Sequence, residues 1–181
     1  MSEFSESYHL LCSNYLDGVS LLKGAGLKGF VFPESSSWAT IVLEGSDFKP
    51  IKKIIESNTG MLVHFVNAED FGWYFSIYDG NKKSCHYECM WQDEIEIADE
   101  EFSMDVFESF VQQCNSGTIV DKKEVEALLH PKGVYTIFNK KPAYRIADLL
   151  GLKNYQWVSF EYVGYDYNGE KDRFPDNIQV K

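Results

Sequence analysis

The chain has 181 residues, 44% of them hydrophobic and 25% charged, so it has the apolar surface to form a core and is not a disordered or low-complexity chain. Its 17 Lys and Arg against 28 Asp and Glu give a formal net charge of −11. Basic residues occur only in short groups, which argues against nucleic acid and anionic membranes, because both bind clustered positive charge. A basic protein would be attracted.

The N-terminal region has no basic stretch followed by an apolar run, so we expect no secretory signal. No apolar stretch approaches the roughly 18 residues of a membrane span. Four cysteines are too few for a disulfide framework in a chain of this length, which indicates a reducing compartment, the cytoplasm. The length favours a single domain over 1–181, with a candidate subdomain boundary near 115–120, and leaves the oligomeric state open.

The first third of the chain mixes helix and strand patterns. Apolar residues spaced three and four apart over 4–23 predict an amphipathic helix that ends near two glycines. Segments 29–32 and 38–45 are rich in aromatic and β-branched residues and flank a turn, which predicts a hairpin over 29–45. Ser46 and Asp47 offer capping oxygens ahead of Pro50, which predicts a helix over 46–57.

The strongest strand pattern runs through the middle of the chain. Segments 61–67, 72–78 and 83–91 are rich in aromatic and β-branched residues, and the turn after the second contains Asp79-Gly80, a strong hairpin signal. Segment 94–98 alternates charged residues with isoleucine, as a strand with one wet face does. Together these segments predict an antiparallel meander over 61–98.

The rest of the chain is predicted to be mostly helical. Ser103 and Asp121 can cap two helices, and Pro142 can open a third that ends at Gly151. The aromatic-rich segment 154–167 predicts a final long strand. The fold class is therefore α+β, with a central, mostly antiparallel sheet made of the meander 61–98 and the hairpin 29–45 and packed by amphipathic helices.

The sequence predicts neither a cofactor nor a metal site. The glycines of 24–29 follow a predicted helix and precede a strand, the reverse of the order in phosphate-binding loops. Strand alternation sends Cys85 and Cys89 to one face and His86 to the other, and no second Cys or His pair accompanies them. The two thiols are therefore interpreted as small buried hydrophobes.

An enzyme is the alternative interpretation. A small hydrolase or transferase would use Cys85 or Cys89 as nucleophile and His64 or His86 as base, in a site beside the meander 61–91. His64 belongs to the strand predicted next to these residues, which gives it an easy route to them. No sequence motif supports the pairing.

The preferred interpretation is a non-enzymatic interaction domain that binds a basic protein partner, in the manner of an immunity or antitoxin module. It rests on the net charge and on a run of carboxylates, the acidic segment, which comprises Asp93, Glu94, Glu96, Asp99, Glu100 and Glu101. These carboxylates can form a ridge on which a cationic surface docks. Charges that protect a solvated edge strand from aggregation would explain the same residues.

Overall fold

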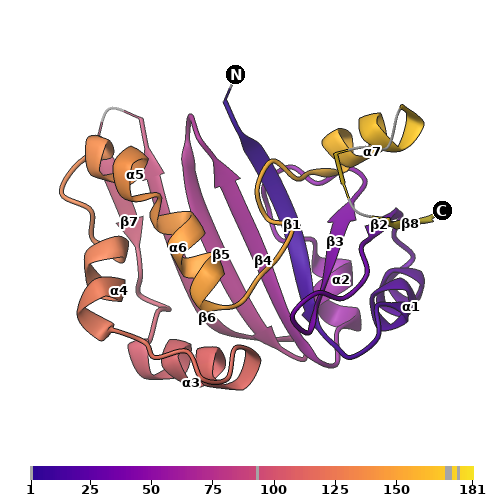
Figure 1. Cartoon of the computed structure of the whole chain (residues 1–181), viewed down its shortest axis with the longest axis horizontal. Coiled ribbons are helices and arrows are strands. Elements are labelled where there is room, and N and C mark those ends of the chain that lie inside the picture. Colours follow the sequence, from indigo (N-terminus) through magenta and orange to yellow (C-terminus); the bar gives the residue numbers. More distant parts are fainter. Residues whose placement is uncertain (1, 93, 170–172, 175) are drawn as a thin grey trace.

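An antiparallel sheet of eight strands crosses the molecule in the computed structural model, which describes residues 2–92, 94–169, 173–174 and 176–181 (Figure 1). The strand order is β7-β6-β5-β4-β1-β3-β2-β8. The strands are β1 (Phe4–Leu11), β2 (Gly29–Val31), β3 (Trp38–Leu43), β4 (Met61–Ala68), β5 (Gly72–Asp79), β6 (Lys82–Trp91), β7 (Ile95–Ala98) and β8 (Ile178–Val180). The predicted α+β fold, with its meander and its β2–β3 hairpin, is confirmed.

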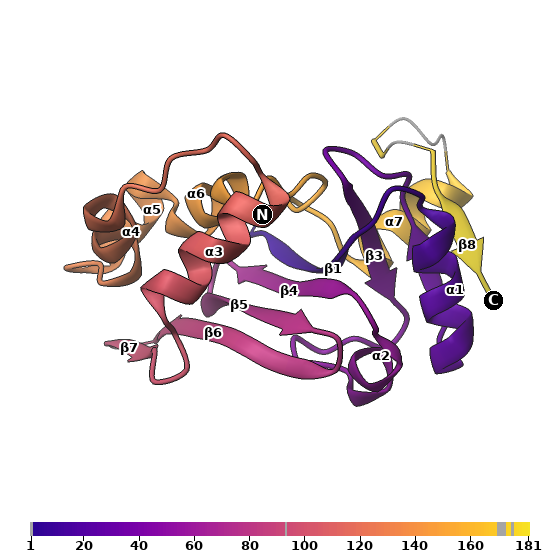
Figure 2. The same cartoon turned by 90° about the horizontal axis from the view of Figure 1, so that it is seen from below.

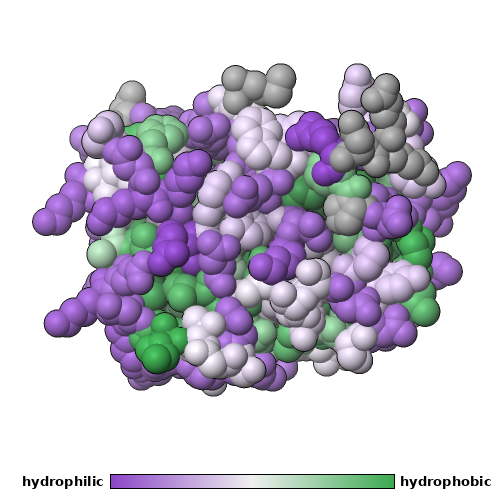
Figure 3. Space-filling view, in the orientation of Figure 1, coloured by the Kyte–Doolittle hydropathy of each residue, from purple (hydrophilic) through white to green (hydrophobic). Residues whose placement is uncertain are grey.

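Helices cover the two faces of this sheet unequally (Figures 1 and 2). They are α1 (Leu16–Ala25), α2 (Lys52–Ser57), α3 (Met104–Cys114), α4 (Lys122–Leu129), α5 (Val134–Lys140), α6 (Pro142–Leu149) and α7 (Phe160–Asn168). Helices α3 to α6 pack their apolar side chains on one face of β4–β6, whereas α1 and α2 pack on the opposite face, near β1 and β3. The outer surface on the α3–α6 side is largely hydrophilic, with small apolar patches (Figure 3).

Aromatic rings dominate the larger core, which lies under α3–α6. Phe75 of β5 is fully buried and contacts the rings of Tyr87 and Phe107, at centroid distances of 6.1 and 5.9 Å. Caps fix the covering helices as predicted, because Ser103 Oγ accepts from Val106 N and the Asp121 side chain accepts from Lys123 N. Among the described residues, no helix is long and apolar enough to cross a membrane.

The predicted helix over 4–23 is wrong in its first half. Residues 4–11 form β1, which lies between β3 and β4, and the helix begins only at Leu16. The apolar residues at Phe4 and Tyr8 fit both the helical and the strand period, so the deciding feature is long-range: the intervening Ser5 is buried and its hydroxyl accepts from Val158 N. Tertiary partners thus override the helical spacing.

The predicted helix over 46–57 is also too long, since α2 begins at Lys52. The segment before it forms a bend, with Phe48 at φ 61°, and two bonds tie it to β1: Phe48 N donates to Glu6 Oε2 at 2.7 Å, and Ile51 N donates to the Tyr8 hydroxyl at 2.8 Å. These donors are therefore satisfied without a helical turn.

The predicted strand over 154–167 is wrong. Ser159 caps a helix instead, and α7 begins at Phe160. The residues just before it lie against β1, where β3 does not reach: Glu6 N donates to Val158 O at 2.9 Å, and Val158 N donates to Ser5 Oγ at 3.0 Å. Helix α5 and strand β8 were not predicted.

Strand β1 carries a histidine in a fully buried, uncharged setting. His9 Nε2 lies 2.9 Å from Ser7 Oγ, and His9 Nδ1 lies 3.3 Å from Thr40 Oγ1, which donates to Lys153 O. Burial, with a smaller contribution from the nearby His64, lowers the pKa of His9 from 6.5 to about 3. The native state therefore holds His9 neutral at pH values where the unfolded chain protonates it.

Stability is expected to fall as pH drops from about 6.5 towards 3, because the unfolded state then binds more protons than the native state. Each such histidine contributes a loss of about 1.4 kcal/mol per pH unit in that window. Urea melts at several pH values measure the slope, and His9→Gln should flatten it. An unchanged slope in this variant would contradict the assignment of a neutral, buried His9.

Replacing Phe75 with alanine should cost about 3–5 kcal/mol of unfolding free energy, because the ring leaves a cavity in the packed core. Tyr135→Ala is the matched control, since Tyr135 is 82% exposed and its loss should change stability by no more than about 0.5 kcal/mol. Denaturant melts of both variants measure the difference. Similar losses in the two would show that Phe75 is not a core residue.

Candidate functional site

A groove of about 580 Å³ lies on the face of β4–β6 opposite α3–α6. We call it the open-face groove. Its floor comes from alternate residues of the three strands, and its wall comes from the segment 47–50 together with Phe71. Phe48 and Phe71 remain 40% and 50% exposed at its margin. The floor residues are Val66, Ala68, Gly72, Tyr74, Ser76, Tyr78, Lys83, His86, Glu88 and Met90.

Strand register places these side chains together. Tyr74 pairs with Glu88, and Ser76 pairs with His86, so their side chains share the face that points away from the aromatic core. The register shifts after Ile77, which brings Lys83 opposite Tyr78. This irregularity places Lys83 at the groove, where its ammonium forms an ion pair with Glu101.

A buried carboxylate positions the wall of the groove relative to its floor. Glu6 Oε1 lies 2.9 Å from His64 Nε2, and Glu6 Oε2 accepts from Phe48 N at 2.7 Å. The Tyr74 hydroxyl donates to Phe48 O at 2.9 Å and lies 3.3 Å from His64 Nδ1. Burial lowers the pKa of His64, and the hydrogen bond to Glu6 raises it by less, so the pKa lies below its usual value.

The groove floor aligns a hydroxyl, an imidazole and a carboxylate. Ser76 Oγ lies 2.8 Å from His86 Nδ1, and His86 Nε2 lies 3.7 Å from Glu88 Oε2. Burial and the charge of Lys83 lower the pKa of His86. Ser76 lies within β5, which pairs with β4 and with β6, so its hydroxyl belongs to a paired strand and not to a turn or a helix N-terminus. The three groups therefore form an ordered polar strip across the floor.

The sheet separates the candidate thiols from the candidate bases. Cys85 and Cys89 lie in the aromatic core, whereas His64 and His86 lie on the opposite face. Burial raises the pKa of Cys85 to about 11 and also raises that of Cys89, so both favour the unreactive thiol form at neutral pH. Within the described ranges, no three His, Cys, Asp or Glu side chains are grouped so that they could hold a metal ion.

The acidic segment divides into two parts. Asp93 lies outside the described residues, and Glu94, Glu96 and Glu100 are exposed. Glu96 pairs with Met90 in register, so it lies on the groove face of the edge strand β7, while Ile95 and Ile97 pack against the core. The remaining carboxylates have partners: Asp99 Oδ2 lies 3.0 Å from His130 Nε2, and Glu101 pairs with Lys83.

Sequence reasoning missed most of the groove. The alternation over 72–78 and 83–91 does place Tyr74, Ser76, His86 and Glu88 on one face, so the floor residues could have been grouped from it. The wall residue Phe48 could not have been added to this group from the sequence, because its backbone is fixed by the distant Glu6.

Comparisons with known proteins found no match, either to a protein-family model or among the curated proteins and the solved structures.

Proposed function

We propose that this chain is a protein-interaction domain that binds a basic segment of a partner protein in the open-face groove and along β7. The observation that carries the proposal is the shared face: the concave surface of about 580 Å³ and the carboxylates of Glu88 and Glu96 lie on one side of the sheet. Exposed Phe48 and Phe71 add apolar contact area at its margin.

Charges around the groove favour a cation. Four carboxylates, of Asp47, Glu88, Glu96 and Glu101, stand against two ammonium groups, of Lys49 and Lys83, which leaves a local charge of −2. Because Lys83 is paired with Glu101, the carboxylates nearest β7 keep their attraction for an incoming positive group. The net charge of −11 acts in the same direction at longer range.

Such a partner would be held by two kinds of contact. Apolar side chains of its basic segment would lie on Tyr74, Met90 and the exposed phenyl rings, and its Lys or Arg groups would meet Glu88 and Glu96. In the manner of an immunity or antitoxin module, occupation of this face would cover a cationic functional surface of the partner.

Charge reversal at Glu94 and Glu96 to lysine should slow association with the purified partner, identified first by capture at low salt. We expect the association rate to fall by about tenfold or more near 0.01 M salt, because electrostatic steering acts over roughly 30 Å there. The difference between variant and wild type should shrink near 0.15 M salt, where screening reduces that length to about 8 Å. Stopped-flow kinetics at both salt concentrations measure the effect.

The matched control reverses Glu44 and Glu126, two exposed carboxylates away from the groove, and changes the net charge by the same amount. If both double variants slow association equally, net charge alone acts and the groove is not the site. If neither does, electrostatic docking on this face is excluded.

A further inference from the structure

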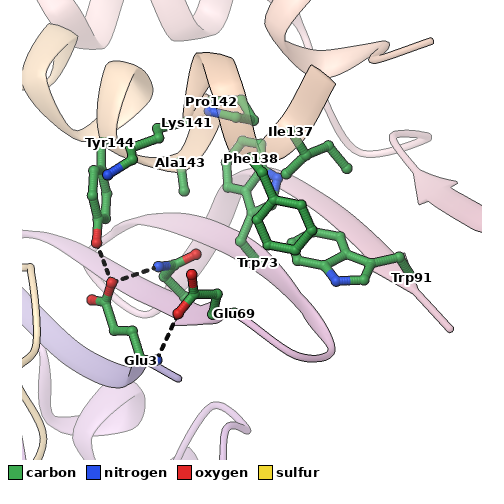
Figure 4. A pocket seen from close by; sticks show the side chains of 11 residues that line it. Glu3, Glu69, Trp73, Trp91, Ile137, Phe138, Lys141, Pro142, Ala143 and Tyr144 are labelled. Atoms are coloured by element: carbon green, nitrogen blue, oxygen red, sulfur yellow. Dashed lines mark hydrogen bonds between the residues drawn. The ribbon is translucent and has the colours of Figure 1, made fainter. Parts of the chain in front are cut away.

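A second cavity, of about 70 Å³, lies on the other side of the sheet, beneath the junction of α5 and α6 (Figure 4). Its volume is several times what one water molecule needs. The sheet contributes acidic, polar and aromatic side chains, and the two helices contribute the opposite wall. The lining residues are Glu3, Asn67, Glu69, Trp73, Trp91, Ile137, Phe138, Lys141, Pro142, Ala143 and Tyr144.

One buried donor in this lining has no partner. Trp73 is 1% exposed, and its Nε1–H donates to no group within the part of the chain that the structure describes. An unsatisfied donor in a buried position is costly, and native proteins rarely keep one without water or a ligand. The indole belongs to a residue that lines the cavity, so its N–H is an unpaired donor at the cavity wall.

Further donors reach the same cavity from the helix junction. Lys141 lies between α5 and α6 with φ 47° and ψ 59°, a left-handed conformation that is uncommon for a residue with a side chain. The bend presents the first turn of α6, which no side chain caps and in which Ala143 and Tyr144 line the cavity. Lys141 Nζ lies 5.4 Å from the centroid of the Tyr144 ring, so its positive charge lies beside the first turn of α6. Indole, amide and ammonium donors together suit a carboxylate.

The sheet side of the cavity carries the opposite charge. Glu3 is buried and its oxygens accept from Asn67, Tyr144, Ser5 and the Trp157 backbone, which satisfies it. Glu69 Oε2 accepts from Glu3 N at 3.0 Å, and Figure 4 shows its carboxylate facing the cavity. A simple carboxylate would be repelled here, whereas a ligand that also carries an ammonium group would be attracted at both ends.

We propose that this cavity binds a free α-amino acid. Its carboxylate takes the donors of Trp73, Lys141 and the first turn of α6, and its ammonium group lies at Glu69. Its side chain lies against Trp91 and Phe138, whose rings meet edge to face at 6.2 Å, with Phe138 46% exposed at the mouth. This site is on the opposite face from the open-face groove and does not depend on it.

Isothermal titration of the purified full chain with each standard amino acid tests the proposal, with acetate and methylammonium as probes that carry one charge each. We expect saturable binding of at least one amino acid and weaker binding of both single-charge probes. Trp73→Phe keeps the aromatic shape but removes the N–H, and should weaken binding tenfold or more. Trp157→Phe is the matched control, since its indole does not line the cavity, and should bind as the wild type does.

Glu69→Gln gives a result that loss of structure would not mimic: amino-acid binding should weaken while acetate binding strengthens, because the repelling charge is gone. Lys141→Gln, at an exposed position, should weaken both. Thermal melts confirm that each variant is folded. The proposal is overturned if no amino acid binds with a Kd below about 1 mM, if the folded Trp73→Phe variant binds as tightly as the wild type, or if acetate alone binds as well as every amino acid.

Discussion

Two buried carboxylates, of Glu3 just before the central strand β1 and of Glu6 within it, are the constraint on which the arrangement of the site depends. A buried carboxylate must find donors, and these two find them in segments far away along the chain. Glu3 accepts from Trp157 N and fixes the approach to α7, while Glu6 accepts from Phe48 N and fixes the wall of the open-face groove. Through these two carboxylates, the start of the chain is hydrogen-bonded both to the segment before α7 and to the wall of the groove.

The groove exists because the helices that follow the meander all pack on one face. Phe75, Tyr87 and their neighbours bury that face under α3–α6. On the opposite face, the apolar cluster of α1 and α2 lies mainly on β1 and β3 and includes only Leu62 of β4 and Tyr78 of β5. The uncovered part carries Tyr74, His86 and Glu88, whose mixed polar and aromatic character suits a surface that stays wet until a partner covers it. Edge strand β7 then adds Glu96 to the same face.

Local patterns predicted the elements whose partners are close in sequence. The β5–β6 turn at Asp79-Gly80 and the caps Ser103 and Asp121 act within a few residues, so the meander and α3 and α4 could be predicted. The predictions for residues 4–11 and 154–158 were wrong because the two segments form hydrogen bonds with each other. Ser5 and Glu6 bond to Val158, and neither segment shows that pairing in its own sequence. Of the candidate site, alternation indicated the acidic face of β7, whereas the groove beside it depends on which face the helices leave uncovered.

The role of Glu6 is tested most directly by amide hydrogen exchange in Glu6→Ala. Removal of both oxygens leaves Phe48 N without its acceptor, whereas Trp157 N keeps its bond to Glu3. We expect exchange at Phe48 to quicken by about tenfold or more, the equivalent of roughly 1.4 kcal/mol of local stability, relative to exchange at Trp157. Equal acceleration at the two amides, or none at Phe48, would contradict the claim that this carboxylate positions the groove wall.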